Sequence, residues 1–306
     1  MNELILQTKN LGKLYKKRWA VKNLNLEIFR GDVFGFLGPN GAGKSTTIRM
    51  LLSLIKPTTG EVFLFGHSVM RERQKALQKV GGIVEKPDFY LYLSAARNLE
   101  IVGALNGGAT RKRIFEVLDL VGLGSRAKDK VKTFSHGMKQ RLGVASSLLS
   151  DPELIVLDEP TSGLDPQGMK EVRDLILHLS RDQKKTILIS SHLLHEIELV
   201  ANRMAIINKG ELVIQGEVSK LLDQEEKYVL FDASPQAKFL AVAKRARKLV
   251  KHLEKKGKEL RATMQFKDVP AFTTLLVRNG IQIRSIIPRR SLEELFLSIT
   301  ESAERT

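Results

Sequence analysis

The pattern of apolar and polar positions predicts a chain in which short buried strands alternate with helices. Several apolar runs are continuous and too short for an amphipathic helix, which is typical of strands buried on both faces. These runs are Val33–Leu37, Leu154–Leu157, Thr186–Ser190 and Met204–Ile207. Helical spacing of apolar residues predicts a helix over Thr46–Ile55, and the stretch Ala95–Leu149 is mainly helical. This alternation indicates an α/β fold with a mostly parallel core sheet.

Both ends of the chain predict further strands. Near the start, Leu4–Leu6 and Leu24–Ile28 are strand runs with polar residues between them. Near the end, Tyr228–Phe231 and Ile281–Ile287 predict strands, and Val269–Val277 predicts a helix.

The stretch Ala237–Leu253 fits two structures. It forms either one basic helix or a short helix followed by a hairpin through Lys255–Lys258. The hairpin is favoured because it completes a β-α-β-β-α-β unit, so we expect a small α+β C-terminal domain that could be ferredoxin-like. At the very end, Ser291 and Glu294 predict a helix-capping box.

Composition limits the class of protein. The chain has 306 residues, of which 42% are hydrophobic, and it has no cysteine. This length suits one large domain with a small one, and the absence of cysteine excludes disulfides and thiol chemistry. We expect no signal peptide at the start, which has an acid at Glu3 and no apolar core, and no stretch reaches the roughly 18 apolar residues of a membrane span. The expected protein is therefore soluble or peripheral.

Charge is distributed unevenly. The net charge is +16, and residues 228–306 carry 16 basic against 8 acidic residues. We therefore expect a large domain over 1–225, with a helical subdomain at about 86–150, and a basic accessory domain over 226–306. The excess positive charge favours an acidic partner such as a nucleotide, nucleic acid or anionic lipid.

A glycine-rich loop follows the strand Val33–Leu37. Residues 38–45, Gly-Pro-Asn-Gly-Ala-Gly-Lys-Ser, match the pattern G-x-x-x-x-G-K-[ST]. Glycines let backbone N–H groups surround phosphate oxygens, and the following helix offers its positive N-terminus. Lys44 would reach the β- and γ-phosphates, and the Ser45 hydroxyl would bind Mg²⁺.

Two acids end the apolar run Leu154–Leu157. Asp158 would hold Mg²⁺ through water, and Glu159 could act as the general base that polarises the attacking water. On their own, two such acids would be ordinary surface residues. Their position downstream of a phosphate loop favours a nucleotide-hydrolysing site.

With these motifs, residues 2–225 resemble the ATP-binding cassette (ABC) family, the motor subunits of ABC transporters. The segment Phe134-Ser135-His136-Gly137-Met138-Lys139-Gln140 resembles the family signature, with Gly-Met-Lys in place of the usual Gly-Gly-Gln. Ser162–Asp165 resembles its D-loop, His192 its switch histidine, and Tyr15 the aromatic residue that stacks on adenine. The resemblance implies ATP and Mg²⁺ as cofactors.

The resemblance also implies a set of site residues. Lys44, Glu159 and His192 are the expected catalytic residues. The expected ATP contacts are Tyr15, Gly38, Pro39, Asn40, Gly41, Ala42, Gly43, Lys44, Ser45, Thr46, Ser135 and Gly137. His192 could instead be a core histidine, and Tyr15 a packed residue at a strand end.

The family pairs two cassettes head to tail, so that the signature of one faces the γ-phosphate held by the other. This chain has one phosphate loop and one signature. A second cassette, most simply another copy, is therefore expected, with Asp165 and the signature residues at the dimer contact.

One position departs from the family pattern. Glu85 stands where the family usually has Gln, and it could still bind Mg²⁺. The extra negative charge would slow hydrolysis until a partner moves the loop. Glu85 and the Gly-Met-Lys-Gln variant resemble the branch that exports bacitracin and lantibiotic-type peptides, and Arg290–Leu297 resembles the closing segment of cassettes that serve drug and antibiotic exporters.

The implied function is an ATPase subunit at the cytoplasmic face of the membrane that drives export through a separate transmembrane subunit. The cargo would be a drug, a peptide antibiotic or a lipid-like molecule. The alternative is a soluble ABC-type ATPase acting on nucleic acid or ribosomes, which the single ATP site and the absence of a long coiled coil disfavour. The basic run Lys244–Lys258 could bind anionic lipid, or it could be a solvated face.

Overall fold

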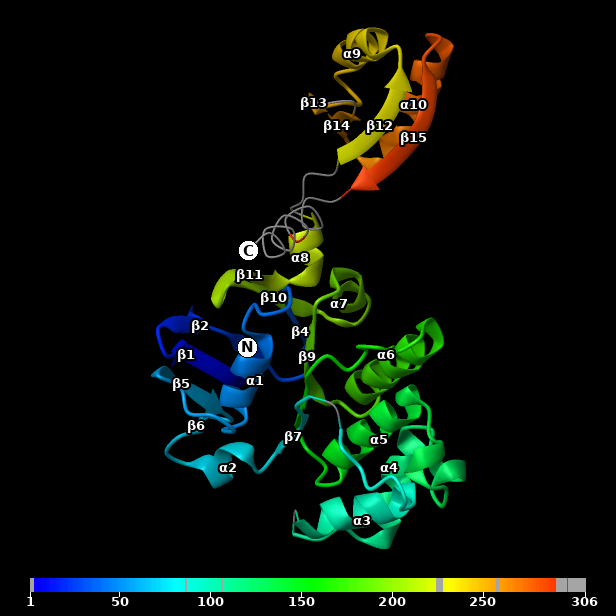
Figure 1. The fold of residues 1–306 in the computed structure, drawn as a ribbon. Coiled ribbons are helices and arrows are strands. Elements are labelled where there is room, and N and C mark those ends of the chain that lie inside the picture. Colours follow the sequence, from blue (N-terminus) through cyan, green and yellow to red (C-terminus); the bar gives the residue numbers. More distant parts are fainter. Residues whose placement is uncertain are drawn as a thin grey trace. The chain divides into compact units, whose positions relative to one another are not determined.

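The structure is a computed structural model that describes residues 3–85, 87–105, 107–223, 228–256, 259–289 and 296. The chain divides after Val218 into two compact units, Met1–Val218 and Ser219–Thr306 (Figure 1). The boundary expected from composition, between residues 225 and 226, adjoins residues 224–227 outside the described ranges and stays a prediction.

A six-stranded sheet forms the centre of the first unit. Its strand order is β11-β10-β4-β9-β8-β7, and only the edge strand β11 is antiparallel to its neighbour. The strands are β4 (Val33–Leu37), β7 (Val80–Ile83), β8 (Leu154–Leu157), β9 (Thr186–Ser191), β10 (Arg203–Asn208) and β11 (Glu211–Glu217). Every residue of β4, β8 and β9 is buried, as expected for parallel strands covered on both faces. The predicted α/β core sheet is confirmed.

A second, antiparallel sheet packs against this core. It contains β1 (Leu4–Tyr15), β2 (Arg18–Leu24), β3 (Glu27–Phe29), β5 (Thr59–Leu64) and β6 (His67–Ser68). Helix α1 (Lys44–Leu51) joins the two sheets, because Ile48 shares one hydrophobic core with Leu6 of β1 and Phe36 of β4. This core fixes the start of α1, and therefore the loop before it, against both sheets.

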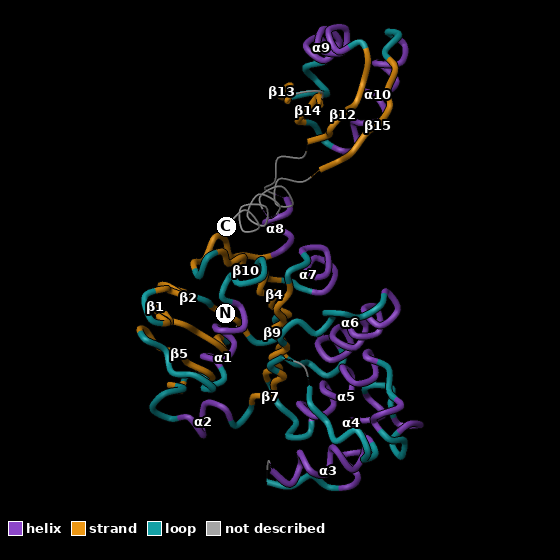
Figure 2. The backbone as a smooth tube through the Cα atoms, viewed as in Figure 1, coloured by secondary structure: helices purple, strands orange, loops and turns teal. Residues whose placement is uncertain are grey.

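Helices cover the core sheet and form a separate cluster. Figure 2 shows α3, α4 and α5 grouped together away from the antiparallel sheet. The cluster contains α3 (Ala95–Leu105), α4 (Arg111–Leu120), the short 3₁₀ helices η1 (Gly124–Arg126) and η2 (Val131–Thr133), and α5 (His136–Leu148). The other helices of this unit and its boundary are α2 (Arg73–Leu77), α6 (Pro166–Arg181), α7 (Leu194–Val200) and α8 (Val218–Asp223).

Turns of the backbone changed the extent of the predicted helix over Thr46–Ile55 and of the predicted strand over Leu24–Ile28. The helix predicted over Thr46–Ile55 ends at Leu51, because Ser53 takes a left-handed backbone with φ of 56° and turns the chain. The strand predicted over Leu24–Ile28 is split between β2 and β3. Leu24 and Leu26 are both fully buried. The alternation of apolar and polar residues over Leu24–Ile28 therefore reflects burial on both sides of the break between β2 and β3, and not one continuous strand.

The second unit has the favoured β-α-β-β-α-β order. Its elements are β12 (Tyr228–Ser234), α9 (Gln236–Arg245), β13 (His252–Lys256), β14 (Glu259–Thr263), η3 (Phe266–Asp268), α10 (Val269–Arg278) and β15 (Gln282–Arg289). The four strands form an antiparallel sheet in the order β13-β14-β12-β15. The rings of Phe231, Phe239 and Phe272 pack with centroids 5.3–5.8 Å apart. Leu260 and Ala262 of β14 are buried in the same core, so the second strand of the hairpin contributes to it.

Two remaining expectations concern the chain's ends and the membrane. The capping box predicted at Ser291 and Glu294 lies outside the described residues. No helix in the described ranges combines the length and apolar character needed to cross a bilayer.

Candidate functional site

The glycine-rich loop connects β4 to the start of α1. Gly43 has φ of 110°, and a Cβ there would lie 2.5 Å from the Ala20 carbonyl oxygen. A Cβ on Gly38 would lie 2.4 Å from the Ile207 carbonyl oxygen. Only glycine fits at these two positions, and the backbone N–H groups at the start of α1 remain available for an anion.

Other predicted loop residues lie around this turn. Pro39, Ala42 and Lys44 are buried, Ser45 and Thr46 are half-buried in the first turn of α1, and Asn40 and Gly41 are exposed. The loop therefore has an open tip and a buried base.

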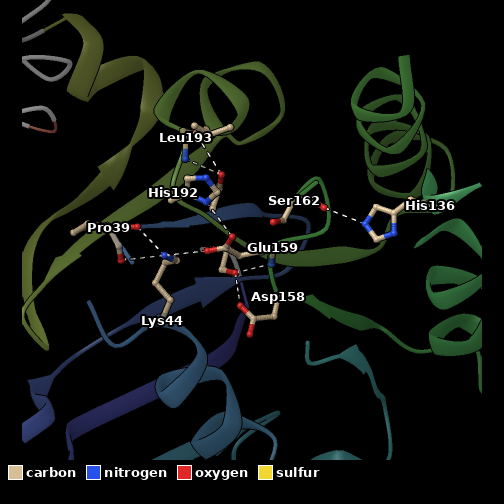
Figure 3. A network of polar contacts seen from close by, with 11 residues as sticks. Pro39, Lys44, His136, Asp158, Glu159, Ser162, His192 and Leu193 are labelled. Atoms are coloured by element: carbon tan, nitrogen blue, oxygen red, sulfur yellow. Dashed lines mark hydrogen bonds and ion pairs between the residues drawn. The ribbon is translucent and has the colours of Figure 1, made fainter. Parts of the chain in front are cut away.

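Lys44 occupies the base of the loop. Its side chain is only 5% exposed, and Nζ donates hydrogen bonds to the carbonyl oxygens of Gly38 at 2.7 Å and Pro39 at 3.2 Å. The same Nζ forms an ion pair with Glu159 Oε1 at 3.1 Å (Figure 3). The positive charge is thus held at the phosphate loop and connected directly to the predicted base.

Glu159 links Lys44 to His192. Its second oxygen, Oε2, lies 2.9 Å from His192 Nδ1 (Figure 3). The His192 side chain is 36% exposed, so it is not a core histidine. Glu159 itself has a left-handed backbone with φ of 49°. This conformation is unfavourable for any residue other than glycine, and such strained residues are frequent at functional sites. Residues from α1, from the end of β8 and from beyond β9 therefore meet at one carboxylate.

Asp158 lies one residue earlier and points into the protein. It is 6% exposed, and Oδ1 accepts a 2.6 Å hydrogen bond from the Ser190 hydroxyl on β9. Among the described residues, no group of three or more acidic or histidine side chains could hold a metal by itself. One carboxylate and the Ser45 hydroxyl are still a donor set that suits Mg²⁺, which takes its other ligands from substrate phosphates and water.

A cavity of about 190 Å³ opens beside Glu159 and His192. Glu159 and His192 line it together with Ser162, Gly163 and Leu164 of the predicted D-loop. The space beside the carboxylate and the imidazole is large enough for water molecules.

The predicted signature lies on a different part of the surface. Ser135 caps α5, with Oγ accepting from the Met138 N–H at 3.2 Å, and a Cβ on Gly137 would make only ordinary contacts, the nearest with Gly168 Cα at 3.7 Å. His136 Nε2 contacts the Ser162 carbonyl oxygen at 3.3 Å (Figure 3). No hydrogen bond or ion pair joins these residues to the phosphate loop within the described part of the chain.

The remaining signature residues lie within α5, and Asp165 of the D-loop caps α6. Met138 and Lys139 are half-buried in the first turn of α5, and Gln140 is buried. Asp165 caps α6 by accepting from the Gly168 N–H at 3.1 Å. The sequence motif alone did not reveal this capping role.

As far as the structure describes the chain, no hydrogen bond or ion pair joins Glu85 or Tyr15 to Lys44, Glu159 or His192, and both make other contacts instead. Glu85 has a left-handed backbone with φ of 67°, and its exposed carboxylate pairs with Arg49 of α1. Tyr15 ends β1 with 46% of its surface exposed, and Lys13 Nζ lies 5.2 Å from the ring centroid. The tyrosine is therefore only partly packed at the strand end, and Lys13 lies over one face of its ring.

Sequence reasoning missed Ser190 as a site residue. Its side chain touches both Asp158 and the backbone of Glu159. The available signal was the pair of serines that ends the buried strand Thr186–Ser191 after the apolar run Ile187–Ile189.

A phosphate-binding loop on one strand and paired carboxylates on a nearby parallel strand are the architecture of P-loop nucleoside triphosphatases. Comparison with known proteins narrows this class. The family model "ABC transporter" matches residues 21–162. The chain is 42% identical to the uncharacterized ABC transporter ATP-binding protein YhcH of Bacillus subtilis, over 97% of this chain and 96% of that protein. It is 40% identical to the bacitracin transport ATP-binding protein BcrA of Bacillus licheniformis, over 96% of this chain and 97% of that protein.

A solved structure gives the same result. The dimeric, post-hydrolysis ATP-binding cassette MJ0796 with ADP and Pi matches with a TM-score of 0.63 and 27% identity, covering 70% of this chain and 99% of that one. The chain belongs to the ABC transporter ATP-binding proteins. It is an ATP-binding and ATP-hydrolysing subunit, as the motifs predicted.

Proposed function

We propose that two copies of this chain bury two ATP molecules between them and hydrolyse them to drive export through a separate transmembrane subunit. The observation that carries the proposal is the convergence of Lys44, Glu159 and His192 beside the phosphate loop. Ser135 and Gly137 belong to the same motif set but make no contact with this point in the described chain. A second copy facing the loop would supply them, and the related MJ0796 cassette is a dimer.

Lys44 would exchange its partners when ATP binds. Phosphate oxygens are better partners for an ammonium group than the Gly38 and Pro39 carbonyl oxygens that Nζ now contacts. Moving Nζ to the β- and γ-phosphates would also release Glu159 Oε1 from its ion pair. Tyr15, with its exposed ring, would stack on adenine.

Mg²⁺ would be held by Ser45, Asp158 and, once its carboxylate leaves Arg49, Glu85, and would supply charge neutralisation at the phosphates. Glu159 would accept a proton from the attacking water, and His192, already 2.9 Å from that carboxylate, would orient the water and the γ-phosphate. Asp165 and the signature residues His136, Met138, Lys139 and Gln140 would lie at the contact between the two copies.

The cargo follows from similarity. BcrA is named for bacitracin transport and shares 40% identity over nearly its whole length. We propose that this chain serves export of a peptide antibiotic, drug or lipid-like molecule, from a peripheral position at the cytoplasmic face of the membrane. The ATPase domain would end near residue 225, and residues 226–306 would form an accessory domain.

Purification of the tagged full-length chain tests this reading directly. We expect an integral membrane protein to copurify in mild detergent, and loss of the chain to raise sensitivity to the exported compound. Copurification of ribosomes or DNA instead would contradict it and support the soluble ABC-type ATPase.

The accessory domain offers a basic helix to anionic lipid. Phe239, Val242 and Ala243 of α9 are buried, whereas Lys244 and Arg245 at its end are exposed. Vesicles containing phosphatidylserine should bind the full-length chain more strongly than neutral vesicles, and less strongly at high salt. Equal binding to both would leave this segment as a solvated face.

A further inference from the structure

Ser190 is a buried hydroxyl placed between the two acids of the hydrolytic site. It is the penultimate residue of β9 and is 1% exposed. Strand β8 runs parallel beside β9, with Leu157 opposite Ile189, so the chain following β8 emerges next to Ser190. The serine is therefore held by the sheet, independently of any ligand.

One oxygen atom of Ser190 holds both acidic residues. Oγ donates to Asp158 Oδ1 at 2.6 Å and accepts from the Glu159 backbone N–H at 2.8 Å. A hydroxyl has one proton to donate and lone pairs to accept, so these two contacts use it in both directions. A donor bound to a carboxylate at this distance is a charge-assisted hydrogen bond, stronger than a neutral one.

The contact to the Glu159 N–H bears on the direction of the Glu159 side chain. Glu159 has φ of 49°, and such a backbone persists in a residue with a Cβ only when its surroundings hold it. From this conformation the carboxylate reaches Lys44 Nζ on one side and His192 Nδ1 on the other. Without the Ser190 oxygen, the peptide before Glu159 would lose the side-chain acceptor that fixes it.

We propose that Ser190 is a positioning residue for ATP hydrolysis: it locks Asp158 and Glu159 in one fixed relation, so that the metal-binding acid and the base are aligned together. Ser190 does not touch the reacting atoms. It acts through its neighbours, and the proposal rests on the roles proposed above for Asp158 and Glu159.

The test is Ser190→Ala in the full-length chain, with Thr186→Val as the matched control. Thr186 is on the same strand, is also 1% exposed, and its Oγ1 accepts a backbone N–H, that of Gly31 at 3.0 Å. Both variants therefore remove a buried hydroxyl that pairs with an N–H, but only one lies beside the acids. Ser190→Thr keeps the hydroxyl, and Ser190→Cys keeps the volume with a weaker donor.

We expect Ser190→Ala to lower kcat by roughly tenfold or more with KM for ATP changed less than about twofold, because misalignment affects the chemical step. Ser190→Thr should recover most of kcat, Ser190→Cys should lie between, and Thr186→Val should keep the wild-type kcat. Hydrogen exchange at the Glu159 amide should accelerate in Ser190→Ala alone.

Three results would overturn the proposal: an unchanged kcat in Ser190→Ala, equal losses in Ser190→Ala and Thr186→Val, or an unchanged exchange rate at Glu159. If Ser190→Ala does not fold, Ser190→Cys and Ser190→Thr are compared instead. A lower kcat in Ser190→Cys than in Ser190→Thr supports the proposal, and equal values of kcat overturn it. A wild-type chain that hydrolyses no ATP would instead count against the proposed function.

Discussion

At the residue scale, Glu85 stands where the family resemblance leads one to expect a glutamine. Its carboxylate pairs with Arg49 of α1, the helix that begins with Lys44, so it is connected to the phosphate loop through one short helix. A glutamine could not form this ion pair. The charge therefore offers a route by which movement at residue 85 reaches the ATP site.

Glu85→Gln should change the amount of transport obtained per ATP hydrolysed, because it breaks the ion pair with Arg49 while keeping the size of the side chain. The measurement is cargo movement and phosphate release from the same reconstituted complex. Arg49→Gln is the matched variant, since it removes the other half of the pair. Unchanged coupling in both variants would rule out this role.

A second group of charges stabilises the fold at the opposite end of the strands. Glu153, just before β8, pairs with Lys79 Nζ at 2.6 Å and Arg30 Nη1 at 2.5 Å. Hydrogen bonds from Lys79 and then Arg30 lower the pKa of the Glu153 carboxyl below its ordinary value. A lowered folded-state pKa means that the unfolded chain binds more protons in acid. The stabilisation is complete above the ordinary Glu pKa of about 4.3 and is lost as pH falls through the lowered value.

Glu153→Gln should therefore lower the free energy of unfolding at neutral pH by about 1 kcal/mol or less, since the pairs are partly exposed. The difference from wild type should shrink as pH falls below about 4. Urea unfolding of both proteins across this range measures it. A difference that stays constant with pH would show that the ion pairs are not its source.

At the element scale, the start of α5 combines a structural and a functional task. Ser135 caps the helix and is also the signature serine expected to face a partner's ATP. Thr110 caps α4 in the same helical cluster, accepting from the Arg113 N–H at 3.1 Å, and has no place in the ATP site. The two caps form a matched pair.

Ser135→Ala and Thr110→Ala should each lower the free energy of unfolding by about 1 kcal/mol, the usual value of a side-chain N-cap. Only Ser135→Ala should also slow ATP turnover. Chemical denaturation and phosphate release measure the two effects separately. If Thr110→Ala slows turnover equally, the loss in Ser135→Ala comes from the helices and not from the signature.

The elements also indicate what sequence can predict. Val33–Leu37 and Leu154–Leu157 were correct to the residue because strands buried on both faces need continuous apolar runs. The helix from Thr46 was too long because apolar spacing continues past Ser53, where the backbone turns. Ser190 was missed because its importance comes from lying beside β8, a pairing between residues more than thirty positions apart that no local pattern contains.

At the scale of the whole molecule, the two units carry charge differently. Residues 228–306 have 16 basic and 8 acidic residues, although the motifs for ATP all lie before them. The MJ0796 cassette covers 70% of this chain and is itself covered to 99%, so an ABC cassette can exist without this accessory unit. The similarity to YhcH and BcrA covers 97% and 96% of this chain, so it extends into residues 228–306.

We propose that ATP hydrolysis needs two copies of the chain, each contributing Glu159 to one site and Ser135 to the other. The most direct measurement is made on Glu159→Gln incubated with Mg²⁺ and ATP and separated by gel filtration. Light scattering gives the mass of the particle, and the nucleotide bound in the same fraction is quantified separately. We expect a particle of two 34.3 kDa chains with one ATP per chain, and phosphate release at least 100-fold slower than wild type. A single chain that binds ATP without pairing, or turnover near the wild-type rate, would contradict the account.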